Sequence, residues 1–292
     1  VFYANAMEVL AGSSQVSLEL GTAVATEPVP CADGWMVSLS DGRCLSARYV
    51  VDTRPPARRP QSILWQSFLG DVVATDRDVF DPNTAVLMDF DEQSSDGVQF
   101  LYVLPTSRRE ALVETTVFGA VPLDPAALRA RHVQGLRARV DGCGYRVQRS
   151  EHGVLPMGHE PLPAAAGVVK ASLFHGGARA STGYAFARIQ SWADTCAAVL
   201  LRGDGPVGPA PDPWLRRVMD EVFLRVLRAH PERGGDLMTR MFDTADPARV
   251  IRFLSDRGSV RDALSVVGSL PPAPFLRATW RALLRQPCRG GV

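Results

Sequence analysis

A single glutamate in an otherwise apolar segment is the residue of this sequence best suited to acid–base chemistry. The segment Glu110–Gly119 alternates as a β-strand does, so that Glu114 shares one face with Leu112, Thr116 and Phe118. Apolar neighbours disfavour the charged form of a carboxyl group, which can then remain protonated near neutral pH. A protonated carboxyl group is what a general acid needs. The alternation is equally compatible with a glutamate on the solvent side of an open sheet.

A glycine-containing stretch before a helix is the second candidate for chemistry. The apolar run Ala171–Phe174 predicts a strand, and the pair Gly176-Gly177 permits positive φ or a close backbone approach. Ser181 and Thr182 stand where N-cap residues belong, because apolar residues then recur at helical spacing. A helix start presents unpaired N–H groups, which suit an anion or a polarised carbonyl. An ordinary turn followed by a capped helix is the simpler interpretation of this pattern.

The composition excludes several classes of protein and site. Apolar residues make up 46% and the formal net charge is +1, so no field suited to nucleic acid is expected. The five cysteines contain no C-x-x-C pair, which indicates a reducing compartment, and the five histidines lack metal-ligand spacing. No signal peptide and no bilayer-spanning apolar run occur in the sequence. We therefore expect a cytoplasmic protein without a metal site.

The first sixty residues predict a helix followed by strands. An amphipathic helix is expected over Phe2–Leu10, and short strands are expected over Val16–Leu18 and Thr22–Val29. A hairpin around Asp41-Gly42 then leads to a strand that ends at Asp52, where a carboxylate can close the corner between strand and loop.

The middle of the chain predicts an antiparallel sheet and the end predicts helices. Residues 61–152 hold consecutive strands with short turns, including a hairpin around Thr106–Arg109 and a last strand over Tyr145–Ser150. Asp124-Pro125 begins a helix within this region. A linker at 203–213 then precedes a helical region.

Several short motifs together resemble the flavoprotein type of lycopene cyclase. The letters GG-A-R-A-S-T-G-Y-A-F, which begin at Gly176, resemble a GG…(R)PSTGY segment of that family, with Ala180 in place of the usual proline. The family's MD, F-x-Y-x-LP and ET strands and its FL…D segment have counterparts in the same order. These are Met88-Asp89, Phe100-Leu101-Tyr102-Val103-Leu104-Pro105, Glu114-Thr115 and Phe253-Leu254-Ser255-Asp256.

The resemblance implies roles for particular residues. The family's catalytic acid falls on Glu114, and a second active-site or flavin-facing carboxylate falls on Asp89. By similarity to FAD-dependent hydroxylases, Asp52 falls beside the cofactor, although Thr53-Arg54 departs from the common Ala-Thr-Gly and the corner role explains Asp52 equally well. The family's loop against the flavin ring falls on Gly176, Gly177, Ser181, Thr182, Gly183 and Tyr184.

The resemblance also implies a fold and a reaction. The fold is the α/β class of FAD-dependent hydroxylases, with a partial Rossmann-type FAD domain at 1–60, a substrate sheet at 61–152, a return to the FAD domain at 153–203 and a helical region at 204–292. The reaction is the acid-initiated, non-redox cyclisation of the end of a linear, lycopene-like carotene. It uses reduced FAD, with NAD(P)H as the reductant.

Two features leave other functions open. A Rossmann unit places G-x-G-x-x-G between its first strand and a helix, and no such unit is predicted here. We therefore expect the chain to bind FAD poorly, and an inactive remnant lacking the first βαβ unit is one alternative. An FAD-dependent monooxygenase or halogenase is another, since it would not need a buried acid at Glu114.

A membrane surface is a possible partner of the last predicted helix. Arg277, Arg281 and Arg285 recur at four-residue spacing beside Trp280 and several leucines. This pattern fits an amphipathic helix on the inner face of a membrane. A core helix with solvated arginines fits it equally well.

Overall fold

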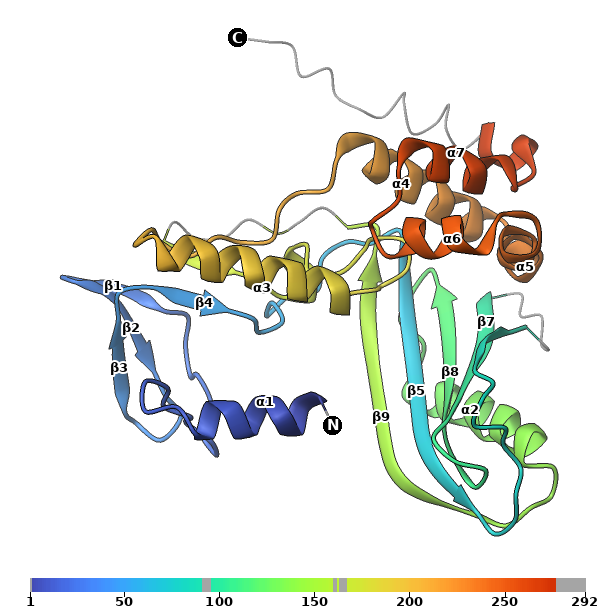
Figure 1. Ribbon diagram of the computed structural model, residues 1–292, viewed down its shortest axis with the longest axis horizontal. Coiled ribbons are helices and arrows are strands. Elements are labelled where there is room, and N and C mark those ends of the chain that lie inside the picture. Colours follow the sequence, from blue (N-terminus) through green and yellow to red (C-terminus); the bar gives the residue numbers. More distant parts are fainter. Residues whose placement is uncertain (1, 91–95, 160–161, 163–166, 277–292) are drawn as a thin grey trace.

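The computed structural model describes residues 2–90, 96–159, 162 and 167–276. A small N-terminal part, a five-stranded sheet and a layer of helices over one end of that sheet make up the described chain (Figure 1). The N-terminal part holds α1 (Phe2–Ala11) and an antiparallel sheet of three strands. These strands are β1 (Val29–Cys31), β2 (Gly34–Ser38) and β3 (Cys44–Ala47).

A short parallel pair joins segments that are far apart in the sequence. β4 (Val50–Asp52) pairs with β10 (Val168–Lys170), with Val50 opposite Val168. The chain then forms the 3-10 helix η1 (Leu173–His175), and α3 (Phe186–Leu201) follows.

The five-stranded sheet has the order β6-β7-β8-β5-β9, and all of its pairs are antiparallel. The predicted hairpin around Thr106–Arg109 is confirmed, because it joins two neighbouring strands of this sheet. The last strand runs on to Met157 and is longer than the predicted Tyr145–Ser150. The strands are β5 (Leu64–Thr75), β6 (Val86–Asp89), β7 (Gly97–Pro105), β8 (Glu110–Gly119) and β9 (Tyr145–Met157).

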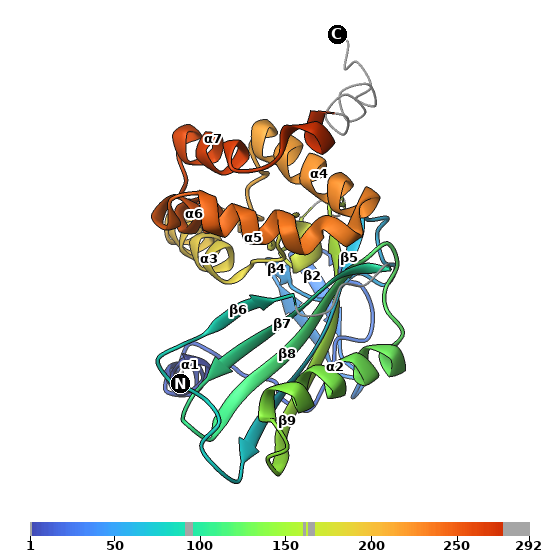
Figure 2. The ribbon, with the colours of Figure 1, turned by 90° about the vertical axis from the view of Figure 1, so that its right-hand side faces the viewer.

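The two faces of this sheet are covered by different helices. α2 (Pro125–Val140) lies along one face, and the C-terminal helices lie over the other face at one end of the sheet (Figure 2). Strand alternation produces this division, because Leu101 and Val103 pack against α2 while Phe100 and Tyr102 face the C-terminal helices. Those helices are α4 (Trp214–Ala229), η2 (Pro231–Arg233), α5 (Gly234–Thr244), α6 (Pro247–Leu254) and α7 (Val260–Gly268).

The helix ends follow from local sequence. Asp124 caps α2 through bonds from the N–H groups of Ala126 and Ala127, as its place before Pro125 predicts. Ser259 and Asp262 form a capping box at the start of α7. Among the described helices, none is long and apolar enough to cross a bilayer.

Two strand predictions in the N-terminal part are wrong. The described backbone over Val16–Leu18 and Thr22–Val29 forms only one isolated bridge, between Val24 and Leu39, and β1 begins at Val29 itself. Val16 and Leu18 are exposed, so the first segment has no core to cover, and the second makes only a few backbone hydrogen bonds, to residues 38–40. Arg277, Arg281 and Arg285 of the predicted last helix lie outside the described residues.

The predicted strand Ala171–Phe174 is also wrong. Its place is taken by the end of β10 at Lys170 and by η1. The side chain of Ser172 accepts a hydrogen bond from the N–H of Phe174, which offers the backbone an alternative to a strand ladder.

Candidate functional site

A largely apolar cavity of about 580 Å³ lies between the five-stranded sheet and the C-terminal helices. Met88, Tyr102 and Phe118 contribute its wall on the sheet, and residues of α4, α5, α6 and α7 line the other sides. The loop between η1 and α3 contributes Thr182 and Tyr184. This volume is in the range of small-molecule sites, and the apolar lining suits an apolar ligand.

Glu114 lies on the cavity side of the sheet. In the strand register it is directly opposite Tyr102 on β7 and Gly70 on β5, and it shares its face with Thr116 and Phe118, as predicted. The hydroxyl of Thr116 donates a hydrogen bond of 3.0 Å to Glu114 Oε1. Burial raises the pKa of Glu114, against the lowering effect of this bond. The carboxyl group therefore has the partly buried setting that a general acid requires.

Two tyrosines line the cavity near the position of Glu114. Glu114 itself does not line the cavity, whereas its cross-strand neighbour Tyr102 does. The side chain of Tyr184 in the loop interacts with that of Tyr102. Burial raises the pKa of both phenols, so both hydroxyls stay protonated at neutral pH and can donate hydrogen bonds.

Asp89 lies on the other side of the sheet. Its carboxylate forms an ion pair with Arg139 of α2. In the strand register Asp89 is opposite Leu101, which packs against α2. The structure therefore does not bring Asp89 together with Glu114.

The loop that follows η1 is a closed turn rather than a helix cap. The N–H of Arg179 donates to Tyr184 O and the N–H of Gly183 donates to Arg179 O, both at 2.9 Å. The prediction that Ser181 and Thr182 cap the next helix is wrong, because α3 begins only at Phe186 and its first residues receive no side-chain cap. The hydroxyl of Ser181 instead donates a hydrogen bond to Asp220 of α4.

The glycines of this loop are required by close contacts and by backbone conformation. Gly176 has a φ of 89° and Gly183 a φ of 71°. A Cβ on Gly177 would lie 2.8 Å from the carbonyl oxygen of Ser172, and one on Gly183 would lie 2.6 Å from Gln66 Oε1. Among the described residues that oxygen of Gln66 is buried without a hydrogen-bond partner. The missing side chains at Gly177 and Gly183 therefore let the loop pack closely against Ser172 and Gln66.

Asp52 closes a corner of the N-terminal part. Its Oδ1 accepts bonds from the N–H and Nε of Arg54 at 3.0 and 2.9 Å, and its Oδ2 lies 2.7 Å from Lys170 Nζ. The hydrogen bonds from Arg54 hold the pKa of Asp52 well below the usual value. Both oxygens are thus engaged by the protein, which matches the corner role.

One glycine pattern matches a dinucleotide motif in letters only. Gly203–Gly208 (GDGPVG) has the spacing G-x-G-x-x-G. It follows helix α3 rather than a strand, and it enters a segment without regular structure that continues to Pro213. It therefore lacks the strand and the helix N-terminus that bind a pyrophosphate. Among the described residues no cluster of His, Cys, Asp and Glu is placed to hold a metal ion.

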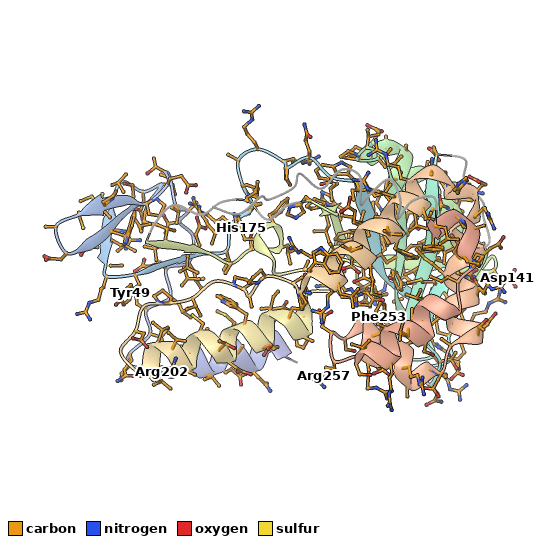
Figure 3. The ribbon with its side chains drawn as sticks, turned by 90° about the horizontal axis from the view of Figure 1, so that it is seen from above. Tyr49, Asp141, His175, Arg202, Phe253 and Arg257 are labelled. Carbon is orange, nitrogen blue, oxygen red and sulfur yellow. The ribbon has the colours of Figure 1, made fainter. Side chains whose placement is uncertain are left out.

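The sequence interpretation assigned no role to a buried arginine of the loop. The side chain of Arg179 is 1% exposed and forms an ion pair with Asp220 of α4, whose side chain is 4% exposed. Phe253, which Figure 3 shows on the helical region near α3, stacks against Arg179 with 4.4 Å between the guanidinium carbon and the ring centroid. An arginine between two alanines inside a glycine loop is the signal that could have drawn attention to it.

Comparison with known proteins gives relatives for most of the chain. The family described as "Lycopene cyclase protein" matches residues 4–280. Lycopene beta-cyclase from a Paracoccus species is 30% identical over 263 residues, which cover 83% of this chain and 66% of the relative. The enzyme of the same name from Pantoea ananas is 26% identical over 261 residues, with the same coverage of 83% and 66%. The chain thus spans about two thirds of the length of these curated relatives.

Solved structures share the fold at low sequence identity. A geranylgeranyl bacteriochlorophyll reductase-like protein from Thermoplasma acidophilum superposes with a TM-score of 0.51 at 10% identity, over 88% of this chain and 68% of that one. A triple mutant of a flavin-dependent brominase gives a TM-score of 0.50 at 14% identity, over 93% and 72%. The predicted α/β fold class, with an antiparallel sheet and a helical region, is thereby confirmed.

Proposed function

Because the chain belongs to the lycopene cyclase family, we propose that it closes a ring at one end of a linear carotene by an acid-initiated isomerisation. The observation that carries this proposal is the position of Glu114. It is a carboxyl group with a raised pKa beside the apolar cavity, in the strand register of Tyr102. An apolar polyene offers no polar atom to bind, so an apolar cavity with few polar groups is the site it requires.

The reaction starts with a proton from Glu114. The proton adds to the terminal carbon–carbon double bond, and the resulting cation is attacked by a second double bond, which closes the six-membered ring. Loss of a proton from an adjacent carbon, which returns to the carboxylate of Glu114, then gives the neutral product and restores the acid, so product and substrate are isomers. Because Tyr102 is opposite Glu114 in the strand register and lines the cavity, we infer that the neighbouring hydroxyls of Tyr102 and Tyr184 pass the proton, each accepting one proton while releasing another.

The faces of aromatic rings suit the cation that forms. Tyr102, Phe118 and Phe253 all line the cavity, and an aromatic face attracts positive charge through its quadrupole. The apolar lining also keeps out water, which would otherwise trap the cation as an alcohol.

We propose that FAD binds along the glycine loop. The proposal is supported by the resemblance of this loop to the family's flavin loop and by Gln66 Oε1 beside Gly183, an acceptor that no donor among the described residues satisfies. Thr182 and Tyr184 connect this loop to the cavity. Reduced FAD, when bound, supplies an electron-rich ring that favours nearby positive charge.

The decisive experiment is product analysis with the purified protein. The protein is incubated with reduced FAD and a linear carotene in vesicles, and the extracted pigments are separated and weighed by mass spectrometry. A cyclic product of unchanged mass is expected, and Glu114→Gln should not form it. A product that has gained oxygen or halogen would instead support a flavin monooxygenase or halogenase and would reject the cyclase proposal.

A further inference from the structure

Two sequence motifs that lie more than seventy residues apart meet at one buried guanidinium. Arg179 belongs to the glycine loop, and its Nη1 donates a hydrogen bond to the backbone oxygen of Phe253 at the end of α6. The same nitrogen lies 3.5 Å from Asp256 Oδ1, and the ring of Phe253 stacks on the guanidinium. The segment Phe253–Asp256, of which the proposed reaction uses only the ring of Phe253, thus binds the guanidinium of Arg179.

The other side of this guanidinium ties the loop to α4. Arg179 Nη2 lies 3.0 Å from Asp220 Oδ1, and the same oxygen accepts a bond of 2.8 Å from the hydroxyl of Ser181. Ser181 and Asp220 both line the cavity, as does Phe253. One arginine therefore fixes three segments of the cavity wall relative to one another.

The network continues to the glycines of the loop. Arg188 of α3 bonds Asp256 Oδ2 at 2.7 Å and Asp212 Oδ2 at 2.9 Å, and its Nη2 lies 3.4 Å from the carbonyl oxygen of Gly176. Arg216 of α4 also belongs to this network, because its Nη1 donates a hydrogen bond of 2.9 Å to Asp212 Oδ1. Arg179, Arg188 and Arg216 thus face Asp212, Asp220 and Asp256, and the charges balance.

Such a network is poorly explained by stability alone. A buried ion pair loses its hydration, and well-packed apolar residues of similar volume often stabilise a protein as well or better. The fixed fork of arginine does provide a specific geometry that a point charge does not. The network therefore serves to fix the relative positions of the segments that it joins.

We propose that Arg179 is a positioning residue that couples the glycine loop to the C-terminal helices, so that the two sides of the cavity open and close as one unit. This inference rests on the proposed function only for the identity of the ligands, a flavin at the loop and a carotene in the cavity. The inference itself states that segments 176–184 and 251–257 open together and close together, in a single equilibrium. Each ligand then favours the arrangement that the other binds.

Native-state hydrogen exchange of the purified protein tests the coupling. In Arg179→Lys, which keeps the charge and loses the fork, amide exchange should rise in both segments by about 5- to 150-fold, the usual range of a coupling between sites. The strands β5 and β8 should be unaffected. The matched control is Arg252→Lys, because Arg252 pairs with Asp262 at 2.7 Å within the helical region. It should raise exchange only around α6 and α7.

Two further measurements keep the test decisive. The double variant Arg179→Met, Asp220→Leu removes both charges of the pair and should fold, with the two segments exchanging independently. FAD added to the wild-type protein should slow exchange in both segments. In Arg179→Lys, FAD should slow exchange only in the glycine loop. Increased exchange confined to one segment in Arg179→Lys would overturn the coupling. An absence of any FAD effect on the wild type, with the coupled increase intact, would reject the cofactor proposal and leave the coupling standing.

Discussion

Asp89 and Glu114 point to opposite faces of the five-stranded sheet. Asp89 pairs with Arg139 under α2, while Glu114 faces the side on which Tyr102 lines the cavity. The irregular register between Val86 and Asp89 produces this arrangement, because it turns Met88 toward the cavity and Asp89 toward α2. The two carboxyl groups thus have separate environments, and only Glu114 is in reach of the proposed site.

The first prediction assigns the acid. Glu114→Gln keeps the shape and the bond from Thr116 but loses acidity, so cyclisation should fall by about 10²- to 10⁴-fold, the usual contribution of a general acid. Asp89→Asn should keep most of the activity and lose stability instead, because it leaves Arg139 with a weaker partner. Pigment analysis and thermal unfolding of both variants measure this. Wild-type turnover in Glu114→Gln, with a large loss in Asp89→Asn, would move the acid to Asp89.

The second prediction concerns stability and pH. The pKa of Glu114 is raised above 4.5 in the folded state, so unfolding releases a proton once the pH exceeds the unfolded value. Glu114 therefore costs nothing well below pH 4.5, and its cost grows as the pH rises toward the folded pKa. Glu114→Gln should accordingly gain stability relative to wild type between pH 4 and pH 8.

A glutamate on the same strand provides the control for this pH dependence. Hydrogen bonds from Thr106 and Gln148 lower the pKa of Glu110, so its stabilising effect is present above pH 4.5 and disappears as the pH falls. Glu110→Gln should therefore lose stability at pH 8 and match wild type at low pH. Urea denaturation at both pH values checks the opposite signs. Parallel curves for the two variants would contradict the raised pKa of Glu114.

Local patterns predict the middle of this fold well. Alternation in Glu110–Gly119 predicts the strand and the residues that share a face with Glu114, and the Asp124-Pro125 pair predicts the start of α2. These features depend on neighbours within a few residues. The same is true of the hairpin around Asp41-Gly42, where Gly42 has a φ of 86°.

Non-local contacts account for what the sequence does not predict. The parallel pairing of Val50 with Val168 needs a partner more than a hundred residues away, so no local pattern indicates it. The face of Asp89 depends on an irregular register against β7, and simple alternation from Val86 would reverse it. The role of Arg179 depends on Asp220 in α4 and on Asp256 just after α6, which only the tertiary fold brings to it.

The third prediction tests the tyrosine pair. Tyr102→Phe removes one hydroxyl while the ring still packs edge-on against Phe100, whose centroid is 5.3 Å away. Cyclisation should slow by about tenfold or more, because the path from Glu114 to the cavity loses a proton carrier. Stability should change little. Tyr145→Phe, in the core on the α2 side, is the control and should leave the rate unchanged. Equal rates in wild type and Tyr102→Phe would show that the proton takes another path.

The fourth prediction concerns delivery of the substrate from a membrane. Val260, Leu264 and Val267 recur along α7 and are 64%, 65% and 49% exposed, and Val267 also lines the cavity. The exposed Arg257 and Arg261 flank this stripe and suit anionic headgroups, each contributing about 1 kcal/mol near such a surface. We propose that this stripe touches the lipid from which the carotene enters. Flotation with anionic vesicles should fall in Leu264→Glu. The control is Leu20→Glu, at a 77% exposed position in the N-terminal part, and equal flotation of the two variants would reject this surface.

The fifth prediction concerns the glycine loop. A Cβ on Gly177 would lie 2.8 Å from the backbone oxygen of Ser172, and a backbone atom cannot move aside as a flexible side chain can. Overpacking of this kind costs about 1–3 kcal/mol. Gly177→Ala should therefore lower the free energy of unfolding by that amount and weaken flavin binding, because the loop must shift. Gly268→Ala is the matched control, since an added Cβ there meets nothing within 4 Å and Gly268 ends helix α7, where alanine is the better helix former. Urea denaturation and flavin fluorescence quenching measure both variants. Unchanged stability and flavin affinity in Gly177→Ala would mean that the loop adapts freely, and the tight packing assigned to it would be wrong.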